Sequence, residues 1–106
     1  MSKAYELGLY EKAMPGTLTW KERLEAAKAA GYDYVEISID ATEEKIARLD
    51  MDRESRLELV KTMYETGIPI RTMCVSALTK YAIGSSDEAC CARGMAILEK
   101  SLQLAD

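Results

Sequence analysis

The sequence predicts an α/β fold of three βα units with a three-stranded parallel sheet, which together form part of a (βα)8 barrel. Short strand-like segments alternate with helical patterns along the chain, an order that implies parallel strands joined by right-handed crossovers. Each predicted strand has one apolar and one polar face, whereas strands of doubly wound sheets tend to be apolar on both faces. The polar faces become more polar toward the carboxyl ends of the strands, where a barrel carries its active site.

The composition indicates one folded domain and excludes several classes of function. The chain has 106 residues, of which 48% are hydrophobic and 30% charged, with a formal net charge of −4. This acidity argues against nucleic acid as a partner, and no apolar run approaches a membrane span of about 20 residues. With no basic-then-apolar leader either, we expect the chain to be cytoplasmic and to bind no membrane.

The chain contains no histidine and three cysteines. The missing imidazole removes the commonest general base and every histidine-containing metal site. Cys74, Cys90 and Cys91 form neither a disulfide framework nor a zinc-binding spacing, so we expect reduced cysteines that pack as small apolar residues.

In the first unit, residues 4–10 are expected to form a strand and the following helix to begin after Thr19. Thr19 and Glu22 have the spacing of a capping box, and Gly31 is expected to end the helix. Glu11 and Lys12, between strand and helix, are interpreted as a solvated pair of charges.

In the second unit, residues 32–39 are expected to form a strand whose apolar and polar residues alternate. An acidic turn at 40–44 and one or two helical turns follow. Asp52 is then expected to cap a long helix that ends at Gly67. Its expected buried face consists of three apolar residues at helical spacing: Leu57, Val60 and Tyr64.

In the third unit, Pro69 precedes a strand expected at 70–76, and residues 77–84 are expected to form a loop. Ser85 and Glu88 have the spacing of a second capping box. The expected apolar face of the last helix consists of Cys91, Met95, Leu98, Leu102 and Ala105. We interpret this face as core or as a partner interface.

Three βα units fall short of a complete barrel, which takes about 250 residues. A three-stranded sheet also leaves two unpaired edges, which proteins normally cover. The sequence is therefore interpreted as the front part of a larger barrel. The alternative is a non-catalytic protomer that self-associates into a homo-oligomer through its exposed sheet edges.

Several segments, in order and spacing, resemble one enzyme family. They include GLYEKA at 8–13, GYDYVEIS at 31–38 and MCVSA at 73–77. The resemblance is to the L-ribulose-5-phosphate 3-epimerase (L-xylulose-5-phosphate 3-epimerase) group, also called hexulose-6-phosphate isomerase, among the xylose-isomerase-like TIM barrels. It covers essentially the whole chain but only about the first third of a family member. It implies that residues 1–106 are the N-terminal βαβαβα segment of a sugar-phosphate epimerase.

The resemblance implies C3 epimerisation of a pentulose phosphate through an enediolate. In the family a divalent metal such as Mn²⁺, Mg²⁺ or Zn²⁺ stabilises the enediolate, and two glutamates move the C3 proton. The family's metal ligands are two glutamates, an aspartate and a histidine from later strands. We therefore expect no catalytic residue and no metal ligand in this chain, and no activity of the chain alone.

The resemblance does imply substrate-binding positions at the ends of the three strands. Tyr10 matches a position that lines the sugar pocket in related ketose epimerases. Glu36 and Ser38 lie at the mouth of the second strand, and Ser76 ends the third. Each has a structural alternative: Tyr10 as a filler of the barrel interior, Glu36 as a hydrogen-bonded structural acid, and the two serines as small packing residues.

Overall fold

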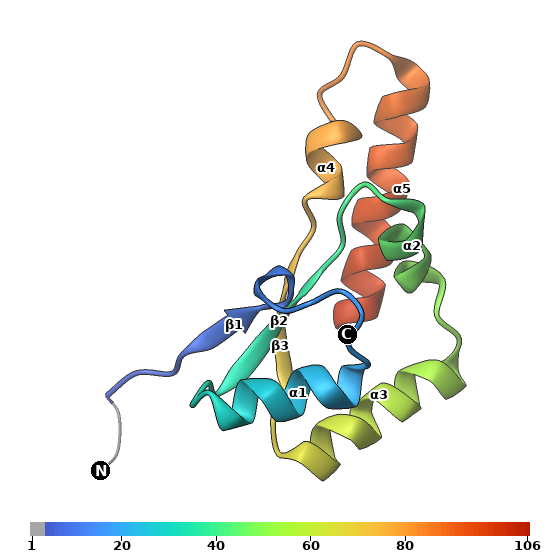
Figure 1. The fold of residues 1–106 in the computed structure, drawn as a ribbon. Helices are drawn as coiled ribbons and strands as arrows, with labels where there is room; N and C mark the ends of the chain where they lie inside the picture. Colours follow the sequence, from blue (N-terminus) through green and yellow to red (C-terminus); the bar gives the residue numbers. More distant parts are fainter. Residues whose placement is uncertain (1–3) are drawn as a thin grey trace. The chain divides into compact units, whose positions relative to one another are not determined.

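The computed structural model describes residues 4–106 and contains a sheet with the strand order β1-β2-β3 (Figure 1). The strands are β1 (Gly8–Tyr10), β2 (Tyr34–Ser38) and β3 (Ile70–Cys74). β1 and β2 are parallel, with Gly8 opposite Tyr34 and Tyr10 opposite Glu36. The predicted α/β fold with a three-stranded parallel sheet is confirmed.

Within residues 4–106, five α-helices and two short 3-10 helices connect or follow the strands. In chain order they are η1 (Glu11–Ala13), α1 (Trp20–Ala29), α2 (Glu43–Ile46), η2 (Ala47–Asp50), α3 (Arg53–Thr66), α4 (Ala77–Lys80) and α5 (Glu88–Ala105). The chain divides into two compact structural units, which do not coincide with the three predicted βα units. The first comprises the residues up to Ile37 together with Asp52–Thr72, and the second comprises Ser38–Met51 and Met73–Asp106.

The core of the first unit lies where α1 and α3 pack against one face of the strands (Figure 1). Its buried members are Leu24, Ala27, Val35 and Ile68. Burial of each large aliphatic side chain contributes roughly 1.5–3 kcal/mol, so this face holds the unit together.

Local capping sets the ends of α1 as predicted. Thr19 Oγ1 accepts a hydrogen bond from the Glu22 amide, and Glu22 Oε1 accepts one from the Thr19 amide. These bonds to Thr19 lower the pKa of Glu22, because they favour its ionised form. Beyond the other end of the helix, Gly31 adopts φ +89°, a conformation that side chains disfavour.

The predicted buried face of α3 is wrong. Leu57 and Tyr64 are 54% and 85% exposed, and Val60 is exposed as well. The face that packs instead includes Met63, which contacts the first core, and the buried Thr66. α3 is apolar on two overlapping faces, and contact with α1 selects the one that carries Met63.

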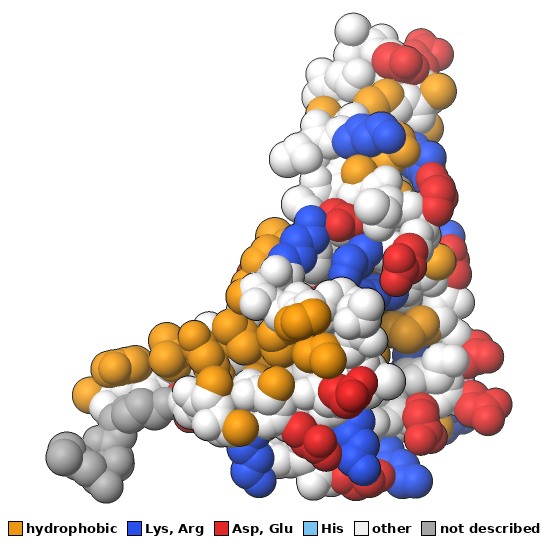
Figure 2. Space-filling view, viewed as in Figure 1, with side chains coloured by type: hydrophobic (Ala, Val, Ile, Leu, Met, Phe, Trp, Pro, Cys, Tyr) orange, Lys and Arg blue, Asp and Glu red, His pale blue; other side chains and the backbone are white. Residues whose placement is uncertain are grey.

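The first strand is shorter than predicted, because residues 4–7 do not join the ladder. The amide of Leu7 donates to the Asp33 carboxylate at 2.8 Å, and the Leu7 carbonyl accepts from the Asp33 amide. Strand pairing therefore begins at Gly8. Tyr5 and Leu7 are exposed, and Figure 2 shows hydrophobic side chains gathered along this part of the first unit.

The core of the second unit forms around Ile39, Leu49, Ala77 and Ile97, with α5 packed against both η2 and α4. The predicted apolar face of α5 is wrong as a core face, since Met95 and Leu102 are 49% and 65% exposed. The buried residues of α5 are Gly94, Ile97 and Ser101. Met95 and Leu102 instead line an open apolar groove on the other side of α5.

Two further local predictions for this unit are wrong. The expected loop at 77–84 begins with the short helix α4. The N-cap of α5 is Asp87, whose carboxylate accepts from the amides of Ala89 and Cys90, while the Ser85 hydroxyl accepts from the Asp87 amide. The three cysteines are free thiols, as predicted.

The segment 69–74 contains one more residue than the segment 35–39 to which it is hydrogen-bonded, although β2 and β3 each have five residues. The amides of Val35 and Ile39, four residues apart, donate to the carbonyls of Pro69 and Cys74, which are five residues apart. Because side chains alternate along a strand, an extra residue reverses the alternation downstream. The reversal sets the direction of Met73, which packs against the second core.

We predict that Gly94→Ala destabilises the chain. A Cβ at Gly94 would overlap the carbonyl oxygen of Tyr81, which is backbone and cannot swing away. Overpacking costs about 1–3 kcal/mol and outweighs the gain of up to about 1 kcal/mol in helix propensity. Urea unfolding should show the loss, whereas Gly84→Ala, which has open space, should leave the unfolding midpoint nearly unchanged. An equal midpoint for both variants would contradict this packing.

Candidate functional site

The carboxyl ends of β1 and β2 carry the candidate site of the first unit. Tyr10 and Glu36 are opposite each other in the strand register, a pairing that was not predicted from the sequence. Glu36 is half-buried, and its Oε2 accepts a hydrogen bond from Thr72 Oγ1 at 2.8 Å. The polar face of the strands therefore presents a phenol beside a carboxylate, both of which hydrogen-bond to hydroxyl groups.

Ser38 and Ser76 belong to the second unit. Ser38 is completely buried, and its carbonyl accepts from Arg48 Nη1 at 2.9 Å. Ser76 is half-buried and occupies the N-cap position of α4, where its side chain makes no capping bond. The burial of Ser38 fits the packing alternative, since direct contact with a substrate would require its neighbours to move.

The backbone joins the segments that carry these two serines. The Ile39 amide donates to the Cys74 carbonyl at 2.9 Å, and the Ile39 carbonyl accepts from the Ala77 amide at 3.0 Å. Ile39, which follows Ser38, is thus hydrogen-bonded to residues that precede and follow Ser76. The ends of β2 and β3 form one hydrogen-bonded edge in this unit.

One buried ion pair was not expected from the sequence. Glu11 is 2% exposed, so its interpretation as a solvated charge is wrong, while Lys12 is exposed. Arg23 Nη1 lies 3.6 Å from Glu11 Oε2, and Arg23 Nη2 donates to the Gly16 carbonyl. The pair closes the connection between β1 and α1 directly after Tyr10. The signal in the sequence that could have indicated this pair is the position of Arg23 on the same face of the helix as the apolar residues Leu24 and Ala27.

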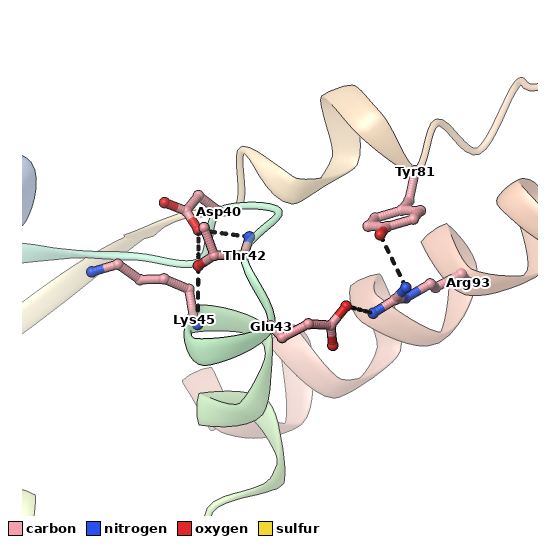
Figure 3. A network of polar contacts seen from close by, with 6 residues as sticks. All are labelled: Asp40, Thr42, Glu43, Lys45, Tyr81 and Arg93. Atoms are coloured by element: carbon pink, nitrogen blue, oxygen red, sulfur yellow. Dashed lines mark hydrogen bonds and ion pairs between the residues drawn. The ribbon is translucent and has the colours of Figure 1, made fainter.

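A second polar cluster lies at the segments that follow β2 and α4 (Figure 3). Arg93 of α5 donates from Nη2 to Glu43 Oε1 at 2.8 Å and from Nη1 to the Tyr81 hydroxyl at 2.9 Å. The guanidinium also lies 4.3 Å from the centroid of the Tyr81 ring. The hydrogen bond to Glu43 raises the pKa of Arg93, because it stabilises the charged form.

Asp40 and Thr42 order the start of the same segment (Figure 3). Asp40 Oδ1 accepts from the Thr42 amide at 2.9 Å and from the Thr42 hydroxyl at 2.6 Å. Thr42 in turn caps α2 by accepting from the Lys45 amide. Sequence reasoning identified this stretch only as an acidic turn.

The described residues do not fit a metal site. Within residues 4–106, no three histidine, cysteine, aspartate or glutamate side chains lie close enough together to hold an ion. This part of the chain therefore offers no ligand set for the divalent cation that the resemblance implies. Over the same residues, no helix has the length and apolar character needed to cross a membrane.

Comparison with known proteins gives consistent matches. Residues 24–106 match the family described as xylose isomerase-like TIM barrel. The chain is 47% identical over 105 residues to the L-ribulose-5-phosphate 3-epimerases UlaE of Escherichia coli O139:H28 and of Shigella boydii serotype 18. These alignments cover 99% of this chain and 37% of each relative, so the chain spans little more than a third of their length.

We predict that Glu11→Gln destabilises the first unit. Loss of the carboxylate leaves the buried Arg23 guanidinium without its counter-charge, and breaking a buried pair costs roughly 3 kcal/mol. The fluorescence of Trp20, the single tryptophan, reports this region because Arg23 stacks on its ring at 4.9 Å.

The matched control is Glu65→Gln, which removes the exposed ion pair with Lys61. An exposed pair is worth about 0–1 kcal/mol, so urea midpoints followed at Trp20 should separate the two variants. Equal midpoints would mean that Glu11 contributes no more than a surface charge.

Proposed function

Because the chain belongs to the xylose isomerase-like TIM barrel family, we propose that it provides the first three βα units of a sugar-phosphate epimerase. The proposed reaction interconverts L-ribulose 5-phosphate and L-xylulose 5-phosphate at C3, in the cytoplasm. The observation that carries this proposal is the 47% identity, along 99% of the chain, to proteins named L-ribulose-5-phosphate 3-epimerase.

In this proposal the chain binds substrate and does not transfer the proton. In the first unit, Tyr10 and Glu36 offer a phenol and a carboxylate to the sugar hydroxyls. In the second unit, we assign a substrate contact to Ser76, the N-cap residue of α4. Ser38 contributes only if its burial is relieved. C3 epimerisation requires that a proton leave one face of the carbon and return to the other, which needs two positioned acid–base groups. We assign those groups and the divalent cation to the part of the relatives that this chain does not span.

A chimera tests the proposal. This chain replaces the corresponding N-terminal portion of the Escherichia coli O139:H28 relative, and conversion of L-ribulose 5-phosphate is followed in a coupled assay. We expect the chimera to turn over and the isolated chain not to. A folded chimera without activity, or turnover by the isolated chain well above background, would contradict the proposal.

Two substitutions in the chimera test the assigned residues. Tyr10→Phe and Glu36→Gln should each raise KM about tenfold, because a hydrogen bond to a charged or polar partner is worth about 1.5 kcal/mol. Glu65→Gln, on the exposed side of α3, serves as the control. KM values equal to that of the control would favour the structural alternatives for Tyr10 and Glu36.

A second candidate role is self-association of the chain as a non-catalytic protomer. The observation that favours it is the open groove on α5, where Met95 and Leu102 leave apolar surface exposed. β1 and β3 are also the outer strands of the described sheet, and unpaired outer strands promote edge-to-edge association.

Light scattering on the purified chain measures this directly. We expect a mass of at least twice that of the chain at high concentration. Leu102→Lys places a charge in the α5 groove without touching the strands, so association that survives this change runs through the sheet edges. A strict monomer at every concentration would rule out the second candidate.

A further inference from the structure

We propose that Arg93 is a positioning residue that fixes the segment after β2 against the segment after β3. It would thereby hold Ser76, which the proposed function assigns to substrate binding, in a fixed position for a pentulose phosphate. The identity of that substrate rests on the proposed function, whereas the fixing of the two segments rests on the contacts of the second unit alone.

Arg93 joins two segments that are far apart in the sequence (Figure 3). Its two Nη atoms donate to Glu43, the first residue of α2, and to Tyr81, the residue after α4. A guanidinium presents several N–H groups in a fixed plane, so the two acceptors are held at a defined separation. A lysine in the same place has no such geometry.

Next to Arg93, the backbone of α5 lies close to the backbone of the segment after α4. Gly94 lets the carbonyl of Tyr81 approach α5 more closely than any side chain would permit. One turn further along α5, Ile97 packs with Ile39 and Ala77 in the second core. Ile39 and Ala77 are also joined by a backbone hydrogen bond at the strand ends. α5 therefore contacts both segments in two ways. Ile97 makes the apolar contacts, and Arg93 makes the polar ones.

A second ion pair on α5 provides the contrast. Lys100 Nζ lies 2.7 Å from Asp50 Oδ1 of η2 and is about as exposed as the Arg93 pair. It joins α5 to η2 through that single carboxylate. If Arg93 acted only as a stabilising surface charge, loss of either ion pair would have the same effect.

Amide hydrogen exchange on the isolated chain tests the fixing role. Arg93→Gln should speed exchange of the Ile39 and Ala77 amides about tenfold, because the bonds that join the two segments open more often. Lys100→Gln should change these rates by less than twofold. Arg93→Lys should recover only part of the protection. Equal rates for Arg93→Gln and Lys100→Gln would overturn the inference.

Kinetics of the chimera test the consequence for substrate. Arg93→Gln should raise KM about tenfold and leave kcat within twofold. When the segments after β2 and β3 are less well fixed, substrate and transition state are both bound more weakly, and to the same extent. Lys100→Gln should leave both constants unchanged. An unchanged KM for Arg93→Gln in an active chimera would overturn the positioning role. An inactive wild-type chimera with the expected exchange pattern would instead contradict the proposed function and support the fixing of the two segments.

Discussion

The burial of one face of β2 is the constraint on which the rest of the structure depends. Val35 and Ile39 are both completely buried, and each is a member of a different core. Residues between them alternate in direction, so the same burial turns Glu36 toward the opposite face. A slip of one residue in the strand pairing would exchange the buried side chains with those on the opposite face, so the register is strongly specified. The position of Glu36 beside Tyr10 is thus a by-product of hydrophobic packing.

Two arginines then order the segments that the strands lead into, one in each unit. Arg23 is buried with Glu11 in the connection after β1, and Arg93 joins Glu43 and Tyr81 in the second unit. In both, a planar guanidinium stacks on an aromatic ring while it donates to oxygen atoms. Such contacts order connecting segments that have little apolar surface of their own.

Features set by neighbouring residues could be predicted from the sequence. The capping box at Thr19 and the glycine ends of α1 and α3 follow from a few adjacent positions, and each is found where it was expected. The placement of Tyr10 and Glu36 on the polar face of their strands followed from the alternation of residues, whereas their pairing is seen only in the structure. For Glu36, the hydrogen bond from Thr72 also fits the structural alternative, and its substrate contact stays a prediction.

Features set by distant contacts could not be predicted in the same way. α3 and α5 are each apolar around more than one face, so periodicity alone chose Leu57 and Met95 where packing chose Met63 and Ile97. Glu11 looked solvated because its partner lies a turn into the next helix. The partners of Arg93 are likewise far away along the chain, and no local pattern marks them.

The extra residue between Pro69 and Cys74 affects how the chain can be engineered. Between Pro69 and Cys74 the residue count decides which side chains downstream enter the second core. Removing one residue there would turn Met73 and Val75 outward and leave polar neighbours in their place. Splice junctions that join this segment to other barrels therefore belong in the stretch around Gly84, where the backbone has open space and no alternation to preserve.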